Sequence, residues 1–107
     1  MKISLSDEIL KVSQVDTLGA ANFEAFREAV QAALPSSSLQ AIEIDLSQAQ
    51  RVDSYGLGAL IAVHKCAANH NGNGAVPVRL LNPPQPVQQL LELTCLHRTF
   101  EIVKRSQ

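Results

Sequence analysis

Alternating apolar and polar positions predict two short strands at the start of the chain. Ile3 and Leu5 alternate with polar neighbours, and Leu10 and Val12 do the same after the polar segment Asp7-Glu8. An alternation with a period of two is typical of strands that bury one face. The short polar connection predicts that the two strands form a hairpin.

Apolar positions three and four residues apart predict a helix that starts after Asn22 and ends before Pro35. Its apolar stripe consists of Phe23, Phe26, Val30 and Ala33 or Leu34. This spacing puts the side chains on one face of a helix. Asn22 is the predicted N-cap, and Ser36-Ser37-Ser38 is predicted to be a loop.

Strands and helices continue to alternate through the rest of the chain. A strand at 41–46 and a connector at 48–52 precede a helix at 54–69, whose apolar stripe is Leu57, Leu60, Ile61, His64 and Ala68. A flexible turn at 71–74, a strand at 76–81, a helix opened by Pro83-Pro84 with the stripe Val87, Leu90 and Leu91, and a short strand at 100–103 follow. Such alternation favours parallel pairing through right-handed crossovers. We therefore expect an α/β fold with a mixed, mostly parallel sheet, an antiparallel edge hairpin and helices mainly on one face.

Composition and charge restrict the classes of function. The chain has 107 residues, 46% of them apolar, and a formal net charge of −1 with scattered basic residues. These values favour a single domain over residues 1–107 and argue against a nucleic-acid partner. No apolar run approaches the ~20 residues of a membrane span, and the polar start does not resemble a secretory signal. We expect a cytoplasmic protein without membrane insertion, in which Cys66 and Cys95 stay reduced.

The most informative segment is 51–60, Arg-Val-Asp-Ser-Tyr-Gly-Leu-Gly-Ala-Leu, between a predicted strand and an amphipathic helix. Asp53 and Ser54 are placed to cap this helix, whose first N–H groups lack partners within it. On spacing alone the segment is a capped helix start, with Gly56 and Gly58 permitting close approach. The same position also presents a serine hydroxyl at a turn. A phosphate there would meet free N–H groups and add about two negative charges.

The segment 42–47, Ile-Glu-Ile-Asp-Leu-Ser, followed by 52–60, resembles the STAS family, in particular bacterial anti-sigma factor antagonists. That family shows a hydrophobic strand that ends in Asp-Leu-Ser, and then Asp-Ser-Ser-Gly-Leu or a close variant. The likeness continues through 81–83, Val87, 90–91 and Leu96 to 100–102. It covers nearly the whole chain and implies the STAS fold.

The resemblance also implies a switch. In the family, the serine after the aspartate is phosphorylated by an ATP-dependent serine kinase that is itself the anti-sigma factor; Ser54 is the matching residue. The unphosphorylated antagonist binds this kinase and frees the sigma factor, and a PP2C-type phosphatase restores it. The partner-binding surface predicted from the resemblance consists of Asp16, Asp53, Ser54, Tyr55, Gly56 and Leu57.

Three positions depart from the family pattern. Tyr55 stands where a second Ser or a Thr is usual, which changes the rim of the surface and not the phosphate acceptor. Ser13 replaces a glycine three residues before Asp16, and Cys95 replaces the glycine of a late Gly-Leu pair. The last two replacements are expected to alter loop geometry more than function.

Other functions have less support in the sequence. His64, Cys66 and His70 do not share one helix face, so we expect no metal. No base accompanies Ser54 and no Gly-x-Ser-x-Gly elbow surrounds it, so we expect neither an enzyme nor a cofactor. The alternatives that stay open are a stand-alone STAS subunit of a transport or other signalling complex, and a small-molecule sensor.

Overall fold

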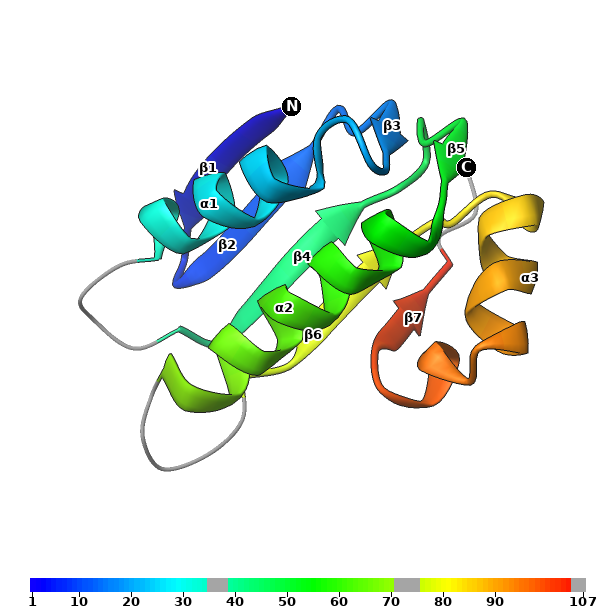
Figure 1. The fold of residues 1–107 in the computed structure, drawn as a ribbon. Coiled ribbons are helices and arrows are strands. Elements are labelled where there is room, and N and C mark those ends of the chain that lie inside the picture. Colours follow the sequence, from blue (N-terminus) through cyan, green and yellow to red (C-terminus); the bar gives the residue numbers. More distant parts are fainter. Residues whose placement is uncertain (35–38, 71–75, 105–107) are drawn as a thin grey trace.

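A five-stranded sheet forms the centre of the protein (Figure 1). The computed structural model describes residues 1–34, 39–70 and 76–104. The strands are β1 (Lys2–Ser6), β2 (Ile9–Ser13), β4 (Ala41–Asp45), β6 (Val78–Leu81) and β7 (Glu101–Val103), and they lie in this order across the sheet. β1 and β2 pair antiparallel, and the other neighbours pair parallel. The edge hairpin and the parallel remainder confirm the predicted α/β class with a mixed sheet.

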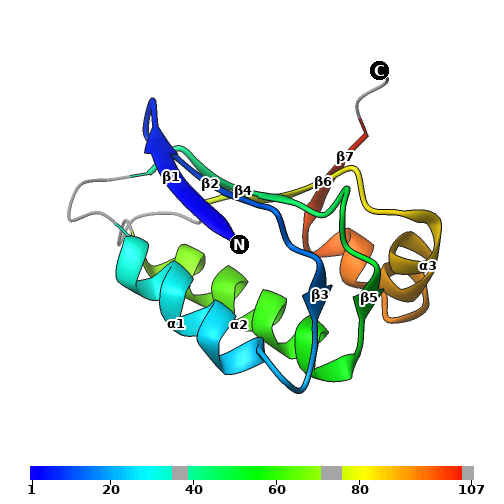
Figure 2. The same ribbon diagram turned by 90° about the horizontal axis from the view of Figure 1, so that it is seen from above.

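The helices cover one face of this sheet (Figure 2). They are α1 (Phe23–Ala33), α2 (Ser54–His70), α3 (Gln85–Leu93) and the short 3₁₀ helix η1 (Leu96–Arg98). Each of the three α-helices crosses from one strand to a parallel one, which is why all three return to the same side. The sequence-based prediction did not include η1.

Rows of apolar side chains across the strands form the core. Leu10, Ile42 and Val78 are aligned on three neighbouring strands, and Val12, Ile44 and Leu80 form the next row. All six are buried. Phe26 and Val30 of α1 and Leu60 and Val63 of α2 complete the same buried cluster. The apolar stripes of the two helices therefore face the sheet, as their spacing predicted.

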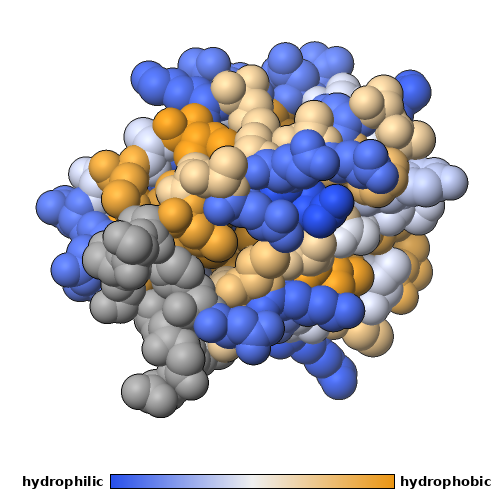
Figure 3. Space-filling model, turned by 60° about the vertical axis from the view of Figure 1, so that its left-hand side comes forward, coloured by the Kyte–Doolittle hydropathy of each residue, from blue (hydrophilic) through white to orange (hydrophobic). Residues whose placement is uncertain are grey.

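The opposite face of the sheet carries charges. Lys11, Glu43, Arg79 and Glu101 are aligned on β2, β4, β6 and β7. The Arg79 guanidinium lies 3.3 Å from a Glu43 carboxylate oxygen and 3.5 Å from one of Glu101. Because these residues alternate with the core residues along each strand, this face stays polar. The side with α1 and β1 mixes apolar and hydrophilic residues (Figure 3).

A second, two-stranded sheet lies beside the start of α2 (Figure 2). It joins β3 (Thr17–Leu18) to β5 (Arg51–Val52) in parallel. The prediction that 48–52 is only a connector is therefore wrong for its last two residues. Strands of two residues are too short to show any periodic pattern. Their pairing brings the segment before α1 alongside the segment before α2.

The prediction that Asn22 is the N-cap of α1 is confirmed for its position, but the side-chain bond of a capping asparagine is not formed. Asn22 occupies the N-cap position of α1, but its side chain makes no capping hydrogen bond. Its Oδ1 accepts the Gly19 N–H at 2.9 Å, and its Nδ2 donates to the Thr17 carbonyl at 2.7 Å. Asn22 therefore holds the loop that precedes the helix.

Ser13 and Cys95 stand where the family pattern has glycine, and at Cys95 a left-handed backbone explains why glycine is usual. Cys95 has φ 61° and follows the last turn of α3, where a left-handed residue usually ends a helix. At the other position Ser13 is the last residue of β2, and the neighbouring Gln14 takes the positive φ of 58°. Both loops thus keep a left-handed residue without glycine.

Cys95→Gly is expected to stabilise the protein. A side chain in the left-handed region is strained by about 1–2 kcal/mol, and the added freedom of glycine in the unfolded chain offsets part of the gain. Chemical denaturation should show a net gain of about 0.5–1 kcal/mol, whereas Cys95→Ala, which keeps the Cβ, should show none. Equal stability of the glycine and alanine variants would contradict this account.

Some predictions lie outside the described residues. These are the Ser36-Ser37-Ser38 loop, the turn at 71–74, the side chain of His70 and the last three residues of the predicted domain. Within the described residues, none of the helices combines the length and the apolar character that crossing a membrane requires.

Candidate functional site at the start of helix α2

Asp53 caps α2. The Gly56 N–H donates to Asp53 Oδ1 at 3.0 Å, and the Leu57 N–H donates to the Asp53 backbone carbonyl at 3.0 Å. A side-chain bond to the third helical residue, together with a first helical bond to the carbonyl, defines an N-cap. Of the two capping candidates in the sequence, Asp53 is therefore the cap, and Ser54 is the first residue of the helix.

The same carboxylate binds the loop before α1. The Ala20 N–H donates to Asp53 Oδ2 at 3.2 Å, across 33 positions of sequence. The Asp53 N–H in turn donates to the Leu18 carbonyl at 3.2 Å. Asp53 thus holds two segments together, the start of α2 and the loop at 18–22 that leads from β3 into α1.

These contacts lower the pKa of the Asp53 carboxyl below its usual value. The largest cause is the Gly56 N–H, which stabilises the charged form; desolvation opposes it. The backbone N–H groups of Ala20 and Tyr55 and the positive charge of Arg51 lower the pKa further. The ionised carboxylate is therefore the form that this site stabilises.

This lowered pKa predicts how stability depends on pH. A carboxyl with a depressed folded-state pKa contributes stability that is present above its unfolded pKa and is lost as the pH falls through the folded value. Asp53→Asn, which keeps a capping side chain but loses its charge, should therefore lower the melting temperature at pH 7, and the difference from wild type should shrink below about pH 4. Thermal unfolding across this pH range measures both effects.

Glu24→Gln is the control for that experiment. It removes one exposed carboxylate from the first turn of α1, so it changes the net charge by the same amount. Its melting temperature should stay within about 1–2 °C of wild type at pH 7. A deficit of the Asp53→Asn variant that stayed constant from pH 7 to pH 2 would contradict the role given to the Asp53 charge.

Two glycines allow the close approach of these segments. A Cβ on Gly56 would overlap the Leu18 carbonyl oxygen, and a Cβ on Gly19 would lie 2.5 Å from Asp53 Oδ2. Gly58, by contrast, has nothing within 4 Å of a Cβ. The predicted close approach is therefore confirmed at Gly56 and wrong at Gly58, and Gly19 is needed for it as well.

Alanine at the two helix glycines should consequently have opposite effects. Gly56→Ala forces the β3 backbone away from α2, and the free energy of unfolding should fall by about 1–3 kcal/mol. Gly58→Ala fills open space in a helix and should raise it by up to about 1 kcal/mol. Denaturant titration of the two variants is the measurement, and destabilisation of both by the same amount would argue against the close packing of Gly56 on Leu18.

Ser54 and Tyr55 lie on the surface beside this capped turn, and both are exposed. Among the described residues the Ser54 hydroxyl has no hydrogen-bond partner, because Asp53 already caps the helix. The Tyr55 side chain is 55% exposed, and its ring lies 5.2 Å from that of Phe23 at an angle of 36°. The site therefore presents a free hydroxyl next to an aromatic pair.

The remaining predicted surface residues lie at different depths. Gly56 and Leu57 are buried and shape the surface from beneath. Asp16 is exposed, and its carbonyl accepts the Gln50 N–H at 2.7 Å, which fixes it at the same end of the molecule as β5. The structure thus places Asp16, Asp53, Ser54 and Tyr55 at one end of the protein.

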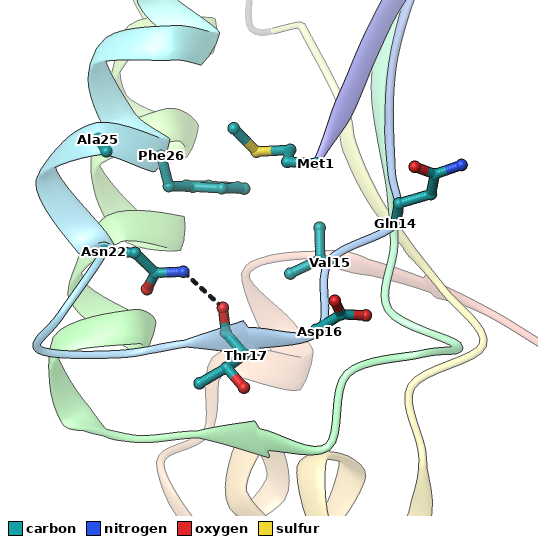
Figure 4. Close-up of a pocket in the computed structure, with 8 residues that line it drawn as sticks. All are labelled: Met1, Gln14, Val15, Asp16, Thr17, Asn22, Ala25 and Phe26. Carbon is teal, nitrogen blue, oxygen red and sulfur yellow. Dashed lines mark hydrogen bonds between the residues drawn. The ribbon is translucent and has the colours of Figure 1, made fainter.

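A cavity of about 240 Å³ adjoins Asp16 (Figure 4). The side chains of Met1, Val15 and Phe26 point toward one another inside it, whereas the Asp16 carboxylate lies at its edge. Polar residues also line the cavity, namely Gln14, Thr17 and Asn22 besides Asp16.

Sequence reasoning missed two parts of this site. Phe23 was predicted only as a core residue of a helical stripe, but it is half-buried and pairs with Tyr55. The Ala20 N–H offers no signal in the sequence, because a backbone donor looks the same at every residue. Gly19 was the one signal in the sequence that this loop approaches another segment closely.

Two of the residues considered for a metal, His64 and Cys66, make contacts with other side chains. The His64 ring meets the Phe100 ring edge-on, with centroids 5.6 Å apart. Cys66 Sγ accepts a hydrogen bond from Gln31 Nε2 at 3.1 Å, which links α2 to α1. In the part of the chain that the structure describes, no three His, Cys, Asp or Glu side chains come together as a metal would require.

The fold and site together define a small α/β domain with an exposed serine at the start of its central helix. A family model described as "Mlab, STAS domain" matches residues 1–104, so the chain belongs to the STAS family. This confirms the resemblance found in the sequence. No curated protein matches the chain.

Solved structures show the same fold. A candidate anti-sigma factor antagonist from Thermotoga maritima gives a TM-score of 0.82 at 22% identity, over 98% of this chain and 86% of that one. An anti-sigma factor antagonist from Mycobacterium paratuberculosis gives 0.77 at 22% identity, over 95% and 82%. The anti-sigma factor antagonist SpoIIAA in its unphosphorylated form gives 0.59 at 13% identity, over 99% and 87%. At these identities the likeness establishes the fold.

Proposed function

We propose that this chain is an anti-sigma factor antagonist, a protein-binding module that is switched by phosphorylation of Ser54. The observation that supports the proposal is that capping and exposure fall to two different residues at the start of α2. Asp53 caps the helix, so the neighbouring Ser54 hydroxyl stays exposed and unbonded within the described residues. Membership of the STAS family and the descriptions of the fold neighbours agree with this role.

The proposed partner is an anti-sigma factor that is also a serine kinase. Ser54 Oγ would attack the γ-phosphorus of the kinase-bound ATP. The new P–O bond forms as the bond to the bridging oxygen breaks, ADP leaves, and the hydroxyl proton passes to a base of the kinase. A PP2C-type phosphatase would reverse the change by hydrolysis, releasing inorganic phosphate and restoring the hydroxyl.

Phosphate alters the docking surface through charge. It adds about two negative charges next to the ionised Asp53, on a surface that also carries the Asp16 carboxylate. The helix itself tolerates an anion at this end, because its dipole and free N–H groups favour one. The domain would therefore stay folded while the kinase is released.

Residues 1–107 act as one domain in the cytoplasm, without a cofactor and without catalytic activity of their own. Ser54 is an acceptor of phosphate in this scheme and not a nucleophile toward a substrate of this protein. Asp16, Asp53, Ser54 and Tyr55 would contact the partner, supported from beneath by Gly56 and Leu57.

A stand-alone subunit of a transport complex is the second candidate. The exposed Tyr55 ring, which packs on the half-buried Phe23, favours it, because an exposed tyrosine can anchor a permanent partner whether or not Ser54 is modified. The genes beside this one separate the candidates. A histidine-kinase-like ATPase supports the switch, and a transporter permease supports the subunit.

Binding to the kinase encoded nearby tests the switch. Ser54→Asp should weaken binding by about tenfold or more, because it places a charge at the centre of the interface. Ser54→Ala should bind within about threefold of wild type and accept no phosphate from ATP. Isothermal titration and transfer of radiolabelled phosphate measure the two effects.

Ser6→Asp is the matched control, since it adds the same charge at an exposed residue of β1 outside the proposed surface. It should bind like wild type. If Ser54→Asp and Ser54→Ala both bound the kinase with wild-type affinity, the switch would be wrong and the permanent-subunit alternative would gain.

A further inference from the structure

The Asp53 carboxylate is both the cap of α2 and the tie to the loop at 18–22, and its neighbour is the proposed phosphate acceptor. We infer that a phosphate on Ser54 weakens the bond between Asp53 and Ala20 and so loosens the 18–22 loop. Phosphorylation would then change the shape of the docking surface as well as its charge. The inference rests on the proposed function only in taking Ser54 as the modified residue.

Two anions would compete for the same donors. Asp53 Oδ1 accepts the Gly56 N–H, and the Tyr55 N–H also stabilises the carboxylate. A phosphate on Ser54 is attached to the adjacent residue, and the first N–H groups of a helix attract it strongly. The carboxylate must therefore share its donors with a group of about twice its charge while the two repel each other.

The bond to Ala20 is the one expected to weaken. At 3.2 Å it is longer than the 3.0 Å bond to Gly56, and it is exposed, whereas the Gly56 bond is partly buried. It also joins separate segments, so no helical geometry maintains it. Repulsion between charges roughly 5 Å apart in a solvated site amounts to about a three- to tenfold change in an equilibrium.

The rest of the loop has bonds that do not involve this carboxylate. The Phe23 N–H donates to the Gly19 carbonyl at 2.8 Å, and the Gly19 N–H donates to Asn22 Oδ1 at 2.9 Å. These bonds should persist, so the loop moves without unfolding. Because the loop leads directly into Phe23, its loosening reaches the aromatic contact with Tyr55 on the docking surface.

Amide hydrogen exchange of the phosphorylated full-length chain tests the inference. Phosphoserine is inserted at position 54 during synthesis, so neither kinase nor partner is needed. Exchange of the Ala20 amide, followed by NMR, should rise about three- to tenfold over the unmodified protein. Exchange of the Phe23 and Leu57 amides, whose acceptors are backbone carbonyls, should change less than about twofold.

Three variants set the scale. Asp53→Asn removes the charge from the tie and should raise Ala20 exchange at least as much as phosphate does. Ser54→Asp should raise it in part, and the neutral Ser54→Asn should leave it unchanged. Comparison of the Ala20 exchange rates of Ser54→Asp and Ser54→Asn separates an effect of charge from an effect of side-chain size.

A selective rise at Ala20 supports the inference. Unchanged Ala20 exchange in the phosphorylated protein, an equal rise at all three amides, or no effect of Asp53→Asn would overturn it. Each of these results leaves the proposed switch standing, since kinase binding is measured separately; conversely, a failed kinase experiment would not alter the exchange of this amide.

Discussion

The rest of the site depends on the hydrogen bonds that the Asp53 carboxylate accepts. One of its oxygens closes the first turn of α2, and the other holds the loop that enters α1. Because an aspartate performs the capping, the following serine hydroxyl is left free within the described residues. The side-chain oxygen of a serine at the cap position would itself accept a helix N–H, and a phosphate on that oxygen would break the cap. The exposure of Ser54 is thus a consequence of its neighbour.

The backbone around Asp53 makes this arrangement feasible. The short β3–β5 sheet brings Leu18 beside Val52, and glycines at 19 and 56 let the two chains cross where a Cβ would collide. Behind them, the apolar rows of the main sheet hold α1 and α2 on one face. The packed sheet and helices therefore position the few residues of this surface.

The sequence predicted the elements whose apolar positions recur at a regular spacing. Alternation predicted strands at 41–46 and 76–81, which the structure has at Ala41–Asp45 and Val78–Leu81. Helical spacing predicted the helix that begins at Ser54, since burial of one face determines both patterns. The pairing of Thr17 with Arg51 could not be predicted, because it depends on chain segments that approach only after folding. The same limit explains why two contacts were not predicted. These are the bonds of the Asn22 side chain to the loop before α1 and the ring contact of Phe23 with Tyr55.

Modification of the protein in its native cell tests the central claim most directly. Intact-mass and fragmentation analysis of the purified chain should find a fraction of molecules heavier by one phosphate, with that phosphate on Ser54. Protein that carries no phosphate under any growth or stress condition, or carries it only on other hydroxyls, would contradict the account.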